Sequence, residues 1–414
     1  MIEDIFKSPA ILARYRDGPL ADAREEFLKH CAKQGYSHPM LRKIAWILLA
    51  VANSIDIDHG NVTTQEIELV VDRRMRFKRQ AIRAKESVWT RQMFVHFVTE
   101  WVRYMGLLQQ PPKVQNISTE KIDVFARYMR EERGLSPVTI STRCERLTWF
   151  FDELHPARDT LRAITVSDVD AFIESKGKQG WKRASLAALA SSLRSFFSFA
   201  EAQGWCNRGI TAVIESPRLY AREGIPESPE WVDIQRLLAS TCGDSPADIR
   251  DHAILMLLSL YGLRRGEVAG LQLGDLDWEG EMIHVARPKQ RITQCYPLLS
   301  AVGEAILRYL RDVRPRCGHR ALFLTLDAPI SQLSAASITP IAHSHLTSLG
   351  LTLSPRGAHC LRHACASHLL SSGFSLKQIG DHLGHRSANS TLSYTKVDLI
   401  GLRQVAELDL GRLL

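Results

Sequence analysis

The chain has 414 residues, more than one domain usually contains, and 45% of them are hydrophobic and 24% charged. This composition excludes a disordered chain and predicts two or three compact units with apolar cores. The net charge of +8 at pH 7 indicates an anionic partner, with DNA, RNA and acidic membrane surfaces all open.

The N-terminal sequence predicts neither a membrane span nor a secretory signal. Its longest apolar run, IAWILLAVA, has nine residues, whereas a spanning helix needs about 20. The first residues, MIEDIF, are acidic where a secretory signal is basic. Eight scattered cysteines without CxxC spacing are typical of reduced, buried thiols. We therefore expect a cytoplasmic protein with no membrane partner.

Two proline-containing segments divide the chain. They are LLQQPPKVQN at 107–116 and ESPRLYAREGIPESPEW at 215–231, and X-Pro steps interrupt helices and favour extended linkers. The predicted domains are an N-terminal helical extension at 1–112, a second helical domain at 117–215 and a larger domain at 226–414.

The first two predicted domains resemble each other. Each contains an apolar-periodic helix, a Gly-x-Ser turn, a helix capped by Thr or Ser, and a final aromatic helix. Gly35 aligns with Gly134, and Gly106 aligns with Gly204. Either the first domain repeats the second, or the similarity is the chance likeness of helical segments.

Basic residues mark candidate DNA-contacting surfaces in these two domains. The run RRMRFKRQAIRAK at 73–85 has seven positive and no negative residues, a density that fits phosphate contacts as well as a solvated helix face. The candidate DNA-binding residues are Arg73, Arg74, Arg76, Lys78 and Arg79 in the first domain, and Arg143, Lys182, Arg183 and Arg194 in the second.

The pattern changes in the third domain. DHAILMLLSLYGL predicts a buried helix, and GEMIHVARPKQRITQCYPLL alternates around a basic turn, which predicts a β-hairpin. Helical patterns follow in AVGEAILRYLRDV, ITPIAHSHLTSL and LRHACASHLLSSG. The predicted fold class is therefore mainly α with a small antiparallel sheet in this last domain, an α+β arrangement.

Two basic positions of the third domain could serve chemistry. In YGLRRGEVAGL at 261–271, two arginines follow the buried helix, and the first, Arg264, could face a ligand or simply pair with Glu267. Lys289, near the hairpin tip, is the only lysine between residues 183 and 376. Because lysine can give up a proton and arginine in practice cannot, Lys289 is a candidate for proton transfer or an ordinary turn lysine.

Histidines and a tyrosine complete the candidate set. In HCLRH at 359–363, His359 and Arg362 share one helix face, and the absence of HExxH disfavours a metal site built on His359 and His363. LGHRSANSTLSYTKV supplies His385 and, nine residues later, Tyr394. Arginine forks fit phosphate oxygens, and nearby cations would make a tyrosine a competent nucleophile, so the set suits attack on a phosphodiester.

These motifs resemble, in order, those of the tyrosine recombinases, also called phage-type integrases. GLRRGE resembles the family's first arginine box, and HCLRH its H-x-x-R box. LGH and TLSYTKV resemble its second histidine and its nucleophile. Gly266 departs from the usual serine before Glu267, and the hairpin turn has Arg-Pro-Lys in place of a glycine-rich turn.

The resemblance implies a role for each proton-moving residue. Tyr394 would attack the scissile phosphate, form a 3′-phosphotyrosyl link and release a 5′-hydroxyl. Lys289 would protonate the leaving 5′-oxygen, and His359 would be the acid/base partner of the tyrosine.

The resemblance also implies how the phosphate is held. Arg264 and Arg362 would clamp its non-bridging oxygens, and His385 would donate a hydrogen bond to it. Arg264 is preferred to Arg265 because the family's arginine directly follows a Gly-Leu pair. No cofactor is needed, because the phosphotyrosyl bond keeps the energy of the broken diester.

By the same resemblance, the partners are double-stranded DNA recombination sites. The protein would be a homo-tetramer on DNA, a monomer or dimer without it, and would work on nucleoid DNA. Transposition, phage integration and chromosome resolution are all open as its purpose, and the extra N-terminal domain favours a mobile element. The second domain resembles the family's core-binding domain, and the apolar-periodic tail VDLIGLRQVAELDLGRLL either packs on its own domain or docks on a neighbour. The alternatives are a type IB topoisomerase and a non-catalytic DNA-binding protein of the same fold.

Overall fold

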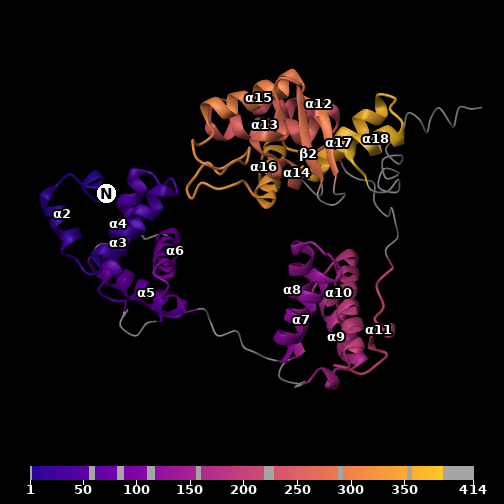
Figure 1. Ribbon diagram of the computed structural model, residues 1–414, viewed down its shortest axis with the longest axis horizontal. Helices are drawn as coiled ribbons and strands as arrows, with labels where there is room; N and C mark the ends of the chain where they lie inside the picture. The colour runs from indigo at the N-terminus through magenta and orange to yellow at the C-terminus, as the bar shows by residue number, and fades with distance from the viewer. Residues whose placement is uncertain are drawn as a thin grey trace, which may run out of the picture. The chain divides into compact units, whose positions relative to one another are not determined.

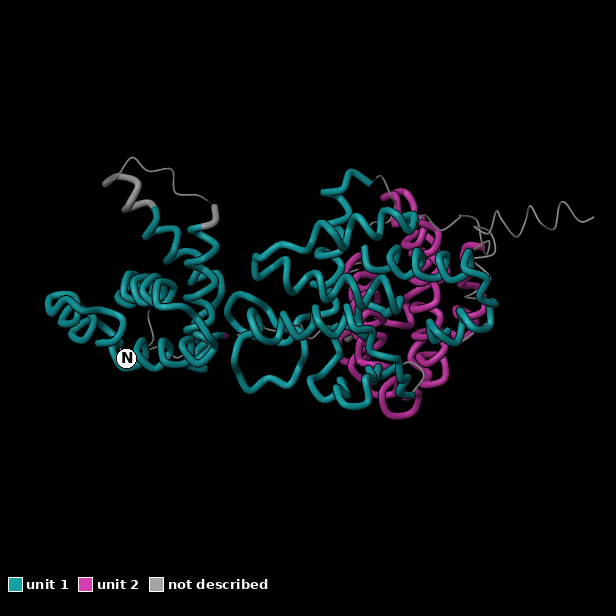
Figure 2. The backbone as a smooth tube through the Cα atoms, turned by 90° about the horizontal axis from the view of Figure 1, so that it is seen from above, with its two compact units in different colours: residues 1–108, 224–414 teal, residues 109–223 magenta. Residues whose placement is uncertain are grey.

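The computed structural model describes residues 2–55, 61–81, 88–109, 117–154, 160–218, 228–287, 292–351 and 357–385, without the side chains of 76–81, 88–89 and 117–118. Contacts divide the chain into two compact units, one of residues 109–223 and the other of residues 1–108 and 224–414 (Figure 2). The described residues form three large hydrophobic cores, one each in the N-terminal, middle and C-terminal parts. The three-domain division stays a prediction.

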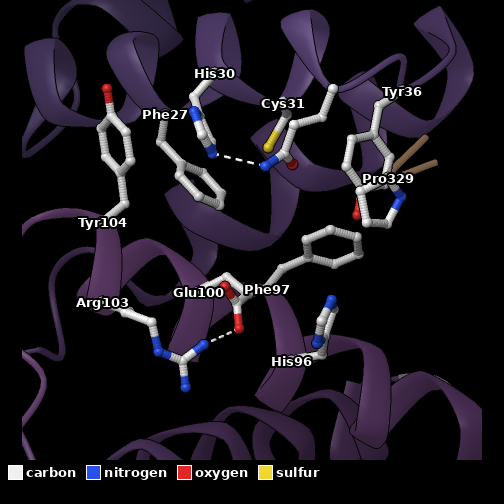
Figure 3. Close-up of a pocket in the computed structure, with 11 residues that line it drawn as sticks. Phe27, His30, Cys31, Tyr36, His96, Phe97, Glu100, Arg103, Tyr104 and Pro329 are labelled. Atoms are coloured by element: carbon white, nitrogen blue, oxygen red, sulfur yellow. Dashed lines mark hydrogen bonds and ion pairs between the residues drawn. The ribbon is translucent and has the colours of Figure 1, made fainter. Parts of the chain in front are cut away.

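The N-terminal part is a helical bundle (Figure 1). Its helices are α1 (Ile2–Ile5), α2 (Pro9–Arg16), α3 (Ala21–Lys33), α4 (His38–Val51), α5 (Thr64–Ala81) and α6 (Val88–Tyr104). Trp101 on α6 is fully buried in its core. Side chains of α3 and α6 line a pocket of about 250 Å³, in which His30 bonds to Gln34 and Arg103 pairs with Glu100 (Figure 3).

The middle part is a second helical bundle with a phenylalanine-rich core. Its elements are α7 (Ile117–Glu131), α8 (Pro137–Leu154), the 3₁₀ turn η1 (Leu161–Ala163), α9 (Val166–Lys178), α10 (Arg183–Ala202) and α11 (Ile210–Val213). Phe150, Phe196 and Phe197 are fully buried and meet edge-to-face, which is an arrangement that aromatic rings prefer.

Both bundles begin their third long helix with the same cap. Thr63 and Glu66 exchange side chain-to-backbone hydrogen bonds before α5, as Thr165 and Asp168 do before α9. Such a capping box satisfies two orphan donors at a helix start. The likeness supports the repeat hypothesis, which stays a prediction.

The C-terminal part carries the sheet. Its elements are α12 (Trp231–Ser240), α13 (Pro246–Leu260), α14 (Arg265–Gly270), η2 (Leu273–Asp275), β1 (Leu276–Asp277), β2 (Met282–Arg287), β3 (Ile292–Pro297), α15 (Ser300–Asp312), α16 (Ala335–Ser348), α17 (Ala358–Ser371) and α18 (Leu376–Leu383). The strands pair antiparallel in the order β1-β2-β3, with His284 opposite Cys295. The predicted hairpin and the mainly helical α+β class are confirmed.

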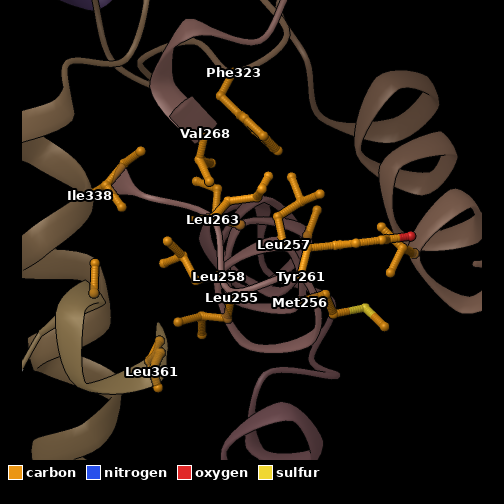
Figure 4. Packing of buried hydrophobic residues seen from close by; sticks show 14 of the residues in the cluster. Leu255, Met256, Leu257, Leu258, Tyr261, Leu263, Val268, Phe323, Ile338 and Leu361 are labelled. Carbon is orange, nitrogen blue, oxygen red and sulfur yellow. The ribbon is translucent and has the colours of Figure 1, made fainter. Parts of the chain in front are cut away.

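Helix α13 lies at the centre of this part. Leu255, Leu257 and Leu258 on it are fully buried, and Phe323 and Leu361 from other segments surround it (Figure 4). Each fully buried leucine stabilises the fold by about 1.5–3 kcal/mol. The segment that follows α13 therefore starts from a fixed point in the core.

All eight cysteines are free thiols, but not all are buried. Cys242, Cys295 and Cys317 are exposed, so the expectation of burial is wrong for these three. Cys295 lies on an outward-facing position of β3, and the other two follow helix ends. Among the described helices, none combines the length and apolarity that a bilayer crossing requires.

Candidate active site

Arg264 sits where the chain leaves the core helix. After α13 the backbone turns through Gly262, at a φ of +60° that favours glycine, and Arg264 becomes the N-cap of α14. Its backbone N–H and its Nη1 donate to the two carboxylate oxygens of Glu267 at 2.8 and 2.7 Å, and its Nη2 donates to the carbonyl of Gly384 at 2.9 Å. The pairing with Glu267 is therefore present. The side chain is still 37% exposed, so it can also reach a ligand.

Arg362 is held more deeply. It lies in the second turn of α17 and is 3% exposed. Its Nη1 donates to the carbonyl of Gly262 at 2.6 Å, and its Nη2 donates to the carbonyl of Leu383 at 2.7 Å. Arg264 and Arg362 thus bond to consecutive carbonyls at the end of α18, although 98 residues separate them in the sequence, and the fold brings the two predicted arginines together.

His359 and His385 join the same site. Burial first, then the charges of Arg362 and Arg264, hold the pKa of His359 below its ordinary value. The same three causes, followed by Arg287 and His363, lower the pKa of His385 to about 4. Both imidazoles are therefore neutral at pH 7. Because Arg362 and Arg264 lower both pKa values, these two arginines and the two histidines share one electrostatic environment.

The His359–His363 pair does not extend to a metal centre in the described chain. The two rings meet edge-to-face with centroids 4.3 Å apart. Burial, His359 and Arg362 lower the pKa of His363 to about 4. Within the described ranges, no three His, Cys, Asp or Glu side chains are placed to share a metal ion.

Arg287 is a site residue that the sequence reasoning missed. It is 2% exposed, and its Nη1 donates to Glu267 Oε1 at 3.2 Å and to the carbonyl of Leu383 at 2.5 Å. A signal was available: Ile283 and Val285 face inward on β2, so the period of two places Arg287 on the same inward face. The Arg-Pro-Lys sequence instead suggests that this arginine belongs to the basic turn.

Lys289 and Tyr394 lie outside the described residues, which stop at Arg287 before the hairpin turn and at His385 before the C-terminal tail. Their predicted roles stay predictions. By sequence, Lys289 follows the last residue of β2 by two positions, and Tyr394 follows His385 by nine.

The candidate DNA-binding residues of the middle bundle divide into two places. Arg143 and Arg194 line one groove of about 530 Å³, together with Arg133 and several serines. Arg143 donates to Ser195 Oγ at 3.0 Å, and Arg194 Nε donates to the carbonyl of Ile214 at 3.2 Å. Burial first, and then the neighbouring charges of Arg133 and Arg146, lower the pKa of Arg143.

The remaining candidates lie at two other positions. Lys182 and Arg183 are exposed at the N-terminal end of α10, about three turns from Arg194 along the same helix. In the N-terminal bundle, Arg73 and Arg74 are exposed on α5. Arg76, Lys78 and Arg79 continue the same helix, and their side chains lie outside the described ones.

Two family models match the chain. The model of the phage integrase family matches residues 232–399, and the model of the phage integrase N-terminal SAM-like domain matches residues 122–204. The first range contains all six residues predicted to be catalytic.

Named relatives agree with these models. A putative integrase/recombinase, y4rA of Sinorhizobium fredii, is 34% identical over 290 residues, which cover 69% of this chain and 70% of the relative. Another from the same organism, y4gC, is 41% identical over 184 residues, 44% of this chain and 95% of the relative. Tyrosine recombinase XerD of Listeria monocytogenes is 29% identical over 69% of this chain and 96% of its own length.

Solved structures share the fold. The XerH recombinase bound to its difH substrate matches with a TM-score of 0.56 and 19% identity, over 83% of this chain and 96% of that one. A lambda integrase dimer bound to a core site matches with a TM-score of 0.53 and 18% identity, over 67% and 94%. The Tn1549 transposon integrase, in complex with a circular intermediate DNA, matches with a TM-score of 0.51 and 17% identity, over 66% and 94%.

Proposed function

This chain belongs to the phage integrase family of tyrosine recombinases, site-specific enzymes that cleave and rejoin DNA, and from that premise we propose which of its residues carry the reaction. The Tyr394 oxygen attacks the scissile phosphorus, a phosphotyrosyl bond forms, and the bond from phosphorus to the 5′-oxygen breaks. The tyrosine proton passes to His359, and Lys289 supplies a proton to the departing 5′-oxygen. Attack by a second 5′-hydroxyl reverses these steps on another strand.

Arg264, Arg362 and His385 hold the phosphate in this proposal. The two guanidinium groups stabilise negative charge on the non-bridging oxygens as it develops. His385 is neutral and donates through one ring N–H. His359 is also neutral, because burial and the two arginines lower its pKa, and a neutral imidazole can accept the tyrosine proton.

The observation that carries the proposal is convergence. Arg264 and Arg362, from α14 and α17, donate to the carbonyls of Gly384 and Leu383, beside His385. If these groups had only a structural role, an ion pair would explain the contact between Arg264 and Glu267 and nothing more. It would not explain why two arginines and two neutral histidines meet at one helix end.

The test is covalent capture on nicked suicide DNA. Duplexes taken from any inverted repeats found in the DNA that flanks the gene would be nicked near the candidate cleavage position and incubated with the protein. Wild type should form an adduct that survives denaturation, and Tyr394→Phe should form none. An adduct with Tyr394→Phe means another nucleophile, and no adduct with wild type on any flanking repeat rejects the enzyme assignment for those sites.

A second substrate tests Lys289. A 5′-bridging phosphorothiolate has a sulfur leaving group, which departs without a proton. Lys289→Ala should cleave ordinary DNA slowly and the phosphorothiolate at close to the wild-type rate. Equal impairment on both substrates would exclude Lys289 as the general acid.

We further propose that the enzyme acts as a homo-tetramer on double-stranded recombination sites. It would move a mobile element and would work on nucleoid DNA in the cytoplasm. Residues 117–215 would grip DNA as the core-binding domain, through Arg143, Lys182, Arg183 and Arg194. The SAM-like family match and the basic groove support that role. Sedimentation with and without a two-site DNA would test the assembly, and strand exchange between two sites, against relaxation of any plasmid, would separate a recombinase from a topoisomerase.

A further inference from the structure

We propose that Arg287 is a positioning residue for DNA cleavage. Its buried guanidinium links Glu267 to the C-terminal end of α18, and this link fixes Arg264 and His385 in the positions from which they contact the phosphate. This inference rests on the proposed function of the same site. Arg287 itself is too deeply buried to be expected to touch DNA, since its side chain is 1% exposed.

Arg287 joins three elements that carry the predicted catalytic groups. It is the last residue of β2, the strand that leads to Lys289. Its Nη1 reaches Glu267 of α14 and the carbonyl of Leu383 in α18 at 3.2 and 2.5 Å. Its Nη2 donates to Tyr296 Oη on β3, and the same hydroxyl donates to the carbonyl of His382.

The position itself does not call for a charge. Ile283 and Val285 precede Arg287 on the inward face of β2, and both are 1% exposed. An apolar side chain would continue that face without desolvation, whereas a buried charge costs several kcal/mol that its partners must offset. What the arginine adds is therefore its set of directed bonds.

Those bonds act on Arg264 through partners that the two arginines share. Arg264 Nη1 and Arg287 Nη1 share one oxygen, Glu267 Oε1, at 2.7 and 3.2 Å. They also bond to the neighbouring carbonyls of Gly384 and Leu383. If Arg287 were removed, Glu267 and the end of α18 would each lose a donor, and Arg264 would move with the partners that orient it.

The test compares two arginines of the same compact unit that both hold backbone carbonyls. Arg287→Met removes the guanidinium and keeps an unbranched apolar chain. Arg314→Met is the matched control, because Arg314 donates to the carbonyls of His319, Ala321 and Leu322 at 2.6, 2.8 and 3.1 Å, away from the site. Both variants should lower the melting temperature.

Cleavage should separate them. With the full chain on the nicked suicide DNA, Arg287→Met should form the adduct about 100-fold more slowly, because misplacing a catalytic group by about 1 Å has an effect of that size. Its Kd for the DNA should change less than threefold, and Arg314→Met should retain the wild-type rate. Equal rates for wild type and Arg287→Met would overturn the proposal and leave the proposed function standing.

A neutral substrate shows whether Arg287 acts through Arg264. A methylphosphonate at the scissile position carries no negative charge, so it depends less on an aligned guanidinium. The deficit of Arg287→Met should shrink to less than tenfold on this substrate. The same deficit on both substrates would mean that the variant has a general structural defect, and would refute the proposal.

Amide exchange in the free protein tests the same coupling without any reaction. The N–H groups of Gly384 and His385 donate to the carbonyls of Asp381 and Gly380 at 3.1 and 2.8 Å. Arg287→Met should speed their exchange at least tenfold, and Arg314→Met should not. Unchanged exchange in Arg287→Met would overturn this proposal, whether or not the protein forms an adduct. Failure of the wild type to form an adduct would count against the proposed function alone.

Discussion

Substituting Gly384 by alanine should damage the site through two separable effects. Gly384 ends α18 at a φ of +62°, a conformation that costs alanine about 1–2 kcal/mol. A Cβ at this position would also overlap the Arg287 guanidinium, far inside any permitted contact. Because that guanidinium is buried and bonded, it cannot simply rotate away.

Gly373→Ala isolates the first effect. Gly373 follows α17, has a φ of +87°, and a Cβ there would meet nothing within 4 Å. It should therefore show only the left-handed cost of about 1–2 kcal/mol. Gly384→Ala should lose about 1–3 kcal/mol more, the usual cost of forcing an extra carbon into a packed site.

Calorimetry of the C-terminal part and adduct formation on nicked DNA measure the two consequences. A difference of about 1–3 kcal/mol corresponds to a melting temperature lower by several degrees in Gly384→Ala than in Gly373→Ala. Adduct formation should fall sharply only in Gly384→Ala, since its Cβ displaces Arg287 and the carbonyls beside His385. Equal melting temperatures and equal cleavage for the two variants would refute the packing described for this corner.

Three further predictions follow from single residues. Folded His385 stays neutral down to about pH 4, while an unfolded histidine protonates below about pH 6.5, so the unfolded state binds more protons between these pH values. Unfolding titrations should therefore show that the free energy of unfolding decreases as pH falls from 6.5 to 4, and that it decreases less steeply in His385→Asn. Arg143→Ala should reduce the slope of log Kd for duplex DNA against log salt by about one, because one phosphate contact is lost; an unchanged slope would remove Arg143 from the DNA surface. Leu257→Ala, at a fully buried position, should lower the free energy of unfolding by about 2–5 kcal/mol, and a loss below 1 kcal/mol in urea unfolding would contradict the packing around α13.

The sequence was sufficient where a pattern depends on side chains close together in the chain. The apolar run from 251 to 263 predicted α13, and alternation around the basic turn predicted the β2–β3 hairpin, because helix and strand periods are local properties. The Gly266 departure has no steric requirement behind it and leaves the local cap in place. A Cβ there would meet nothing within 4 Å, and Glu267 supplies the cap of Arg264.

The alternation of β2 places Arg287 on the inward face, but the sequence does not predict the partners of its guanidinium. Arginine is mostly exposed in proteins, and only the approach of α14 and α18 gives this one its partners. The acceptors at the end of α18 are backbone carbonyls, which every residue type provides, so no letter of the sequence marks them. The same holds for Arg362, which donates to the carbonyls of Gly262 and Leu383.

The charge balance of the site follows from these carbonyls. Arg264 and Arg287 share one carboxylate, Glu267, so two positive groups meet one negative group there. Arg362 donates to the carbonyl of Leu383 beside them. The carbonyls of residues 382–384 lie at the C-terminal end of α18, where the helix dipole is negative, and they offset part of the excess without neutralising it. A scissile phosphate would supply negative charge beside Arg264, the most exposed of the three arginines. The free enzyme is therefore built around an electrostatic deficit that a DNA backbone can fill, and its arginines are held in place by backbone before any DNA arrives.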